Sequence, residues 1–150
     1  MSILAQQLMS QDSTGFSFSP VEVARFSPED IRLAIQSLLG EDRVNLAYAL
    51  GDAGLALYPE SEDILAVTSL LAVMAQDWPQ AVDLIRQLME MQNGQATVFT
   101  HAMLIRSLRC NLEYASGFEA ARDALALFPN HPELLKEYQA LADAMGLSAV

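Results

Sequence analysis

The stretch EDILAVTSLLAVMAQDWPQAVDLIRQLMEMQN, residues 62–93, consists of two apolar runs separated by a turn at residues 76–79. In the first run apolar side chains cover almost every side of a helix, whereas in the second Ala81, Leu84 and Ile85 recur at helical spacing. Ser61 can cap the first run, and the pair Asn93-Gly94 can end the second. The stretch therefore predicts two helices joined by a short turn.

A similar phrase occurs on both sides of this stretch. The sequence ALYPESEDIL starts at residue 56 and ALFPNHPELL starts at residue 126, so the two are separated by two periods of about 35 residues. The breaker Asn93-Gly94 lies near the midpoint between Pro59 and Pro129. A period in this range is typical of helix-turn-helix repeats, which bury their apolar faces against one another.

Helix signals on both sides of the central stretch extend the pattern to seven helices, with no strand signal between them. Caps are expected at Ser27, at Ser61 and at Asn130 or His131, and Gly40 is expected to close the first helix. The expected ranges are about 28–39, 42–57, 62–74, 78–92, 96–112, 116–128 and 132–145. The fold class is therefore all-α, an array of antiparallel helix hairpins with three pairs and a C-terminal capping helix.

Residues 1–27 differ in composition from the rest of the chain. The stretch DSTGFSFSP, residues 12–20, predicts an irregular segment after an optional short helix near Ile3–Met9. Because Phe16, Phe18 and Phe26 are too apolar for a free tail, we expect the segment to pack on the helical domain or in a groove. Residues 28–150 form the helical repeat domain in this interpretation.

Residues 62–93 resemble a unit of the tetratricopeptide repeat (TPR) family. The first helix of that family has a large residue near its start and small residues where the second helix crosses, as at Leu65, Ser69 and Ala72. The family's turn has an acidic or Gly-like residue, an aromatic residue, two variable residues and Ala, and the stretch DWPQA, residues 77–81, matches it. Small side chains let two helix axes approach closely, and the aromatic ring fills the wedge between neighbouring pairs.

The resemblance extends over about residues 28–146, and the outer units match it less well. Residues 28–59 match mainly at Ala47, Leu55, Leu57 and Pro59, and residues 96–129 end in the usual closing phrase ALALFP. The aromatic position of the third turn is filled by Tyr114 or by Phe118, four residues later, so the register of the third pair stays open. A helical hairpin array outside the TPR family is the alternative.

The TPR resemblance implies a concave groove, lined by the first helix of each pair, that binds a peptide or protein. The implied partner-binding residues of the best unit are Asp63, Ala66, Leu70, Val73 and Met74. The third unit would add His101, with Arg106 or Arg109 according to register, and the first unit would add Glu29, Arg32 and Gln36. Such a groove would be apolar in its middle, which suits a peptide with hydrophobic anchors.

Each of these residues also has a structural interpretation. The Leu, Val and Met stripe can be helix core, and Arg106 and Arg109 can form a solvated face. In a chain with only 8 basic residues, the two arginines can instead hold a partner's carboxylates. The single cysteine, Cys110, is interpreted as a small apolar side chain in a helix.

Charge and composition restrict the expected partners. The formal net charge of -11 disfavours nucleic acid and anionic membrane surfaces. The start of the sequence lacks signal-peptide features, and no apolar run is long enough to span a membrane, so a cytoplasmic protein without membrane insertion is expected. His101 and His131 are the only histidines, and no catalytic triad order, phosphate loop or metal motif is present. No enzymatic activity, catalytic residue, metal site or cofactor is predicted.

Two functions fit these features. The first is a small chaperone that shields an apolar segment of a client protein, because short acidic repeat proteins of this size resemble the chaperones of bacterial type III secretion. The second is a structural adaptor or self-assembling scaffold that buries its apolar face in a homo-oligomer. A chaperone is expected to be a monomer or small homodimer that gains a client, whereas a scaffold assembles alone.

Overall fold

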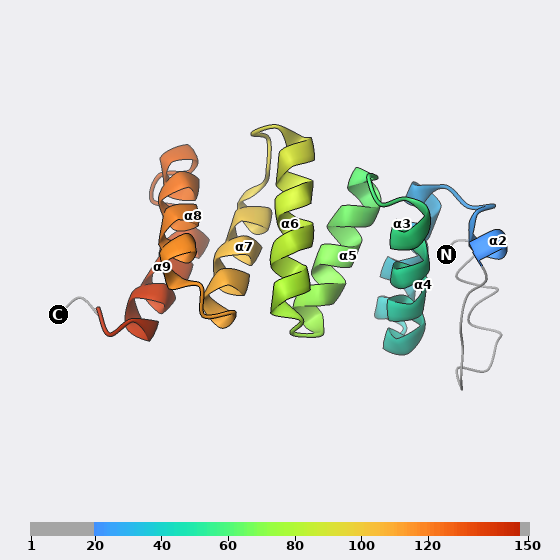
Figure 1. The fold of residues 1–150 in the computed structure, drawn as a ribbon, viewed down its shortest axis with the longest axis horizontal. Coiled ribbons are helices and arrows are strands. Elements are labelled where there is room, and N and C mark those ends of the chain that lie inside the picture. Colours follow the sequence, from blue (N-terminus) through green and yellow to red (C-terminus); the bar gives the residue numbers. More distant parts are fainter. Residues whose placement is uncertain (1–19, 148–150) are drawn as a thin grey trace. The chain divides into compact units, whose positions relative to one another are not determined.

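The computed structural model describes residues 20–147, and these contain helices and no strand (Figure 1). The expected helix near residues 3–9 and the packing of Phe16 and Phe18 lie outside the described residues. The helices are α2 (Pro20–Val23), α3 (Pro28–Gly40), α4 (Val44–Leu57), α5 (Glu62–Met74), α6 (Trp78–Gln92), α7 (Val98–Cys110), α8 (Tyr114–Leu127) and α9 (Pro132–Ala144). The all-α fold class and the seven helices after residue 27 are confirmed.

The helices repeat with the expected period. The helices α3, α5, α7 and α9 each contain 13 residues and begin at residues 28, 62, 98 and 132, so their starts are 34, 36 and 34 residues apart. The intervening helices α4, α6 and α8 begin at residues 44, 78 and 114, again 34 and 36 residues apart. The register of the third pair is thereby fixed, because Tyr114 begins α8 as Trp78 begins α6.

The structure corrects the expected bounds of three helices and one helix-closing turn. The second helix begins at Val44 instead of residue 42, and the fifth spans Val98–Cys110 instead of residues 96–112. A start of the sixth helix at residues 116–118 is wrong, since α8 begins two residues earlier, at Tyr114. Gly40 was expected to supply the turn that closes the first helix, but it is the last residue of α3, and Asp42 takes the left-handed conformation, with φ of 59°.

The same C-terminal motif ends α3, α5, α7 and α9. The second residue after each helix has positive φ, namely Asp42 (59°), Gln76 (58°), Leu112 (62°) and Gly146 (73°). The next amide donates to a carbonyl five residues back, as in Arg43 N to Leu38 O (2.7 Å) and Glu113 N to Leu108 O (2.8 Å). This is the Schellman motif, which satisfies carbonyls that the helix leaves without partners. The repeat is therefore one of backbone geometry, although four different residue types fill the left-handed position.

The left-handed backbone conformation of Leu112 lowers the stability of the fold, since this conformation costs roughly 1–2 kcal/mol for residues other than Gly, Asn or Asp. Its side chain is 72% exposed, so little packing is lost when it is removed. We expect Leu112→Gly to raise the free energy of unfolding by about 1 kcal/mol, measured by urea denaturation. Leu112→Ala keeps the Cβ atom and should give no such gain; an equal gain from both variants would contradict the backbone explanation.

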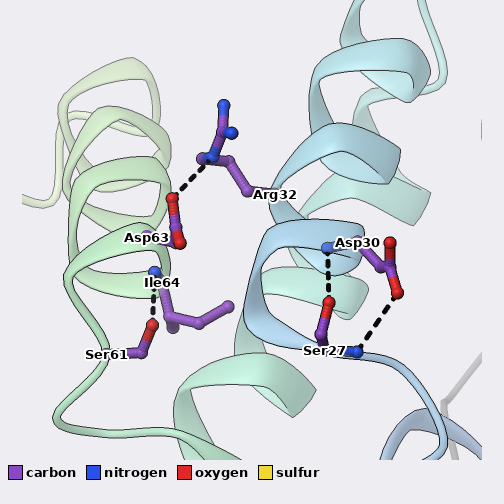
Figure 2. Close-up of polar contacts among 6 residues, drawn as sticks. All are labelled: Ser27, Asp30, Arg32, Ser61, Asp63 and Ile64. Carbon is purple, nitrogen blue, oxygen red and sulfur yellow. Dashed lines mark hydrogen bonds and ion pairs between the residues drawn. The ribbon is translucent and has the colours of Figure 1, made fainter.

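The first-turn amides are capped largely as the sequence predicts. Ser27 and Asp30 form a reciprocal capping box, in which Asp30 N donates to Ser27 Oγ at 3.1 Å (Figure 2). Ser61 Oγ accepts from Ile64 N, and His131 Nδ1 accepts from Glu133 N at 3.3 Å. These bonds satisfy orphan amides and fix where α3, α5 and α9 begin.

The chain divides into two compact units, up to Leu71 and from Ala72 onward, and each is described by itself. In the first unit α3 packs on α4, and its fully buried side chains include Ile31, Ile35, Leu38 and Leu50. Val23 of α2 is 1% exposed within this core, and the Tyr58 hydroxyl donates to the Phe26 carbonyl at 2.9 Å. Residues 23–26 thus pack on the helices, while the expected domain boundary at residue 27 stays a prediction.

The second unit packs α7 against α6, α8 and α9. Ile105, Ala121, Ala124 and Leu134 form a buried cluster contributed by α7, α8 and α9. Gly117 of α8 lets this helix approach α9 closely, since a Cβ atom at Gly117 would lie 3.2 Å from both methyl groups of Leu141. Helix α7 therefore packs against three other helices, and only a narrow part of its surface is accessible to solvent.

Candidate functional site

The register defines one stripe on each of α3, α5 and α7, formed by the second, fifth, ninth, twelfth and thirteenth residues of the helix. We call it the first-helix stripe; in an ideal helix these positions fall within about 100° of one another. On α5 it consists of the predicted residues Asp63, Ala66, Leu70, Val73 and Met74, and on α7 it consists of Phe99, Ala102, Arg106, Arg109 and Cys110. The α5 and α7 residues are all at least partly exposed.

In the first unit, the structure brings together two predicted residues from different helices. Arg32 Nε donates to Asp63 Oδ1 at 2.8 Å, and the two side chains are 28% and 45% exposed. An ion pair this exposed contributes roughly 0–1 kcal/mol to stability, so it orients the arginine more than it stabilises the fold. Figure 2 shows the two terminal nitrogens of Arg32 pointing away from Asp63.

The remaining α5 residues of the stripe are apolar. Ala66 and Leu70 of the first unit are half-buried. Val73 and Met74 belong to the second unit, where Val73 is half-buried and Met74 is 46% exposed. The apolar character expected for this part of the site is therefore present on a partly exposed surface.

The two arginines of α7 have different surroundings. Arg106 is exposed, and no ion pair to it is found within residues 20–147. Arg109 is half-buried, and its Nη2 lies 3.7 Å from Glu137 Oε2 of α9, close enough for an ion pair and too far for a hydrogen bond. Arg109 Nε is buried and has no hydrogen-bond partner. Arg106 is thus the arginine of α7 that can meet a partner's carboxylate directly.

His101 does not lie on the first-helix stripe. It is the fourth residue of α7, about 140° around an ideal helix from Arg106, and it matches buried Leu65 of α5. Its side chain is 5% exposed, and its ring meets Phe128 edge-on at 5.8 Å. Burial lowers the pKa of His101 below its ordinary value of 6.5, although the Asp123 carboxylate acts in the opposite direction. Nε2 is buried without a hydrogen-bond partner.

Phe99, like Ala102 and Cys110, is a residue of this surface that the sequence analysis did not select. It is 60% exposed, and it takes the position on α7 that Asp63 takes on α5. The repeat register could have identified it. If Tyr114 occupies the third turn, as counting back from Pro129 suggests, then α7 begins at Val98 and Phe99 is its second residue. An aromatic ring this exposed leaves apolar surface in contact with water.

Neither a metal site nor a membrane span is found in the described part of the chain. Within residues 20–147 no group of three or more His, Cys, Asp or Glu side chains is arranged to hold a metal ion. In the same range, every helix is too short or too polar to cross a bilayer.

The sequence matches no protein-family model and no curated protein. Two solved structures of MamA match the fold. A mutant form of MamA gives a TM-score of 0.72 at 18% identity, covering 83% of this chain and 71% of the other. The structure of MamA MSR-1 C2 gives 0.73 at 18% identity, covering 83% and 70%. At this identity the likeness concerns the fold alone, and the fold is a TPR-like helical repeat.

Proposed function

We propose that this chain binds a segment of a protein partner along the first-helix stripes. The observation that carries the proposal is the stripe of α7, where the exposed ring of Phe99 and the exposed guanidinium of Arg106 lie on one side of the same helix. Exposed aromatic and arginine side chains are the residue types that contribute most to protein interfaces. A TPR-like fold supports the same class of function, since such repeats serve mainly as protein-binding scaffolds.

The spacing of Phe99 and Arg106 specifies what the partner must present. Seven residues of an ideal helix rise about 10.5 Å, and an extended peptide covers that distance in roughly three residues. The partner segment therefore carries an apolar side chain and a carboxylate about three residues apart. Arg32, oriented by Asp63, offers a comparable carboxylate contact in the first unit.

Quantitative affinity capture from a cell extract tests this function. We expect Phe99→Asp and Arg106→Glu each to reduce recovery of the same partner at least about fivefold, which corresponds to roughly 1 kcal/mol. Leu127→Asp is the matched control, because Leu127 is 56% exposed and lies on α8, outside the stripes. Unchanged recovery of every partner by folded Phe99→Asp and Arg106→Glu variants would rule the stripe out.

Within this class, we propose the chaperone-like role, in which the half-buried apolar residues of α5 shield an apolar client segment. A cytoplasmic location and a place in type III secretion belong to the same proposal, and they depend on the resemblance in size and acidity. A purified client segment should stay soluble in the presence of the wild-type protein and aggregate with Leu70→Asp.

A scaffold function is favoured by a separate observation on α9. Leu135, Tyr138, Met145 and Leu147 in and after this helix are 43%, 39%, 41% and 59% exposed. Self-association through them would give a mass that rises with concentration in light scattering, and Tyr138→Glu would abolish the rise. A monomer at all concentrations would leave the partner-binding function in place and exclude the scaffold.

A further inference from the structure

A small cavity opens in the second unit between α6, α7 and α8. Its volume is about 250 Å³. Glu119 and Asp123 line it from α8, where a spacing of four residues places both carboxylates on one face of the helix. Arg86 lines it from α6, and His101 lines it from α7. The cavity thus has an acidic wall on α8 that faces other elements of the same unit.

Charge favours a cation in this cavity. Two carboxylates and one guanidinium line it, and the burial of His101 lowers its pKa, which disfavours a positive charge on its ring. Glu119 and Asp123 are both exposed, so neither is committed to the core. The formal net charge of -11 adds to the attraction of a cation from a distance.

Size and lining favour one side chain over a larger ligand. Pockets for drug-sized small molecules measure roughly 300–1,000 Å³, and this cavity lies below that range. Met89 and Leu104 also line it, and they provide apolar contact for a methylene stem. Long basic side chains combine such a stem with a charged head.

We propose that this cavity receives an arginine or lysine side chain of a protein partner. The charged head lies against Glu119 and Asp123, and the stem lies over Met89 and Leu104. The site is distinct from the first-helix stripe, because His101 points to a different side of α7 from Arg106. The proposal therefore does not depend on the function assigned to the stripe.

In this arrangement Arg86 repels the incoming cation. It has the same charge as the incoming side chain, so it opposes binding and directs the charged head toward α8. Replacing Arg86 with glutamine should therefore tighten cation binding. If the cavity instead received an anion, the same substitution would weaken binding, so this variant separates the two ligand classes.

The test is an NMR titration of the full chain with N-acetylarginine amide, following the ring signals of His101. His131 is the internal control, because it caps α9 and does not line the cavity. We expect saturable shifts at His101 with a dissociation constant on the order of 1–10 mM, and none with N-acetylnorleucine amide. The pair Glu119→Gln and Asp123→Asn should weaken binding about tenfold or more, since it removes both charged acceptors. Arg86→Gln should strengthen it.

Three results would overturn the proposal. One is the absence of saturable His101 shifts with N-acetylarginine amide. Another is equal affinity in the doubly substituted variant, whose folding the NMR spectrum itself reports. The third is a saturable shift with N-acetylglutamate amide that Arg86→Gln removes, which would make the cavity an anion site.

Discussion

Replacing Gly51 with leucine is expected to lower the free energy of unfolding by about 3 kcal/mol. Gly51 lies buried in α4, and a Cβ atom there would lie 2.6 Å from Leu71 Cδ1 of α5. The same atom would lie 3.7 Å from Thr68 Cγ2 and 4.0 Å from Ile35 Cδ1. A leucine adds carbon atoms to a space closed by side chains of α3 and α5, so the helices of the first unit must separate.

Alanine at the same position should cost much less. The atom nearest to its Cβ is the flexible end of Leu71, which can rotate away, and alanine favours a helix over glycine by roughly 1 kcal/mol. The two terms nearly offset each other, so Gly51→Ala is expected to be close to neutral. The dependence on side-chain size distinguishes overpacking from a change in helix propensity.

Chemical denaturation followed by far-UV circular dichroism measures both variants. Gly40→Leu is the control, because a Cβ atom at Gly40 meets nothing within 4 Å. At that exposed end of α3, leucine should raise stability by about 0.5 kcal/mol. A loss at Gly40 as large as that at Gly51 would show that packing at Gly51 is not the cause.

The predictable part of the fold is encoded locally. Ser27 with Asp30 and Ser61 before an acidic pair identified two helix starts, because a capping side chain and its target amide are only three residues apart. The repeat period followed from the same kind of local signal, the residues that begin and end helices, since the helix starts recur after 34 or 36 residues. No long-range information is needed for either result.

The register of the third pair stayed open between two residues in the sequence because the residue at its turn is atypical. The turn depends on Leu112 at φ of 62°, and leucine rarely adopts that conformation, so the sequence has no sign of it. Two aromatic residues then compete for the turn position. The structure gives it to Tyr114, while Phe118 packs edge-on against Tyr138 of α9 at 5.5 Å. The choice depends on a helix 20 residues farther along the chain.

The candidate site was predictable as a helix face and not as a set of contacts. Arg32 and Asp63 were both assigned to the stripe from helix positions, yet their ion pair joins residues 31 apart. Arg106 and Arg109 were alternatives that depended on register, whereas the pairing of Arg109 with Glu137 requires α9 to lie against α7. The role of these residues in partner binding stays a prediction.

Replacing His101 with leucine is expected to raise the free energy of unfolding by about 2 kcal/mol at neutral pH. Leucine fills the equivalent position of α5, where Leu65 is 1% exposed, so the site accepts an aliphatic side chain of similar size. The change removes a buried nitrogen, Nε2, that has no hydrogen-bond partner. The edge contact with Phe128 is replaced by an apolar contact with the same ring.

The advantage of the variant should grow as the pH falls. Because burial lowers the pKa of His101 in the folded state, the unfolded chain binds a proton more readily below pH 6.5. The wild-type protein therefore loses stability as the pH falls through 6.5 toward the folded pKa, and the loss stops below that value. The leucine variant lacks this proton and shows no such step.

Denaturation followed by the fluorescence of Trp78, the only tryptophan, reports the second unit at a series of pH values. The carboxylates and His131 are present in both proteins, so the difference between them isolates His101. We expect that difference to be positive at pH 7.5 and to increase toward pH 5. A constant difference would mean that the folded pKa is not lowered, and a negative one would mean that the buried ring makes a stabilising contact that leucine cannot replace.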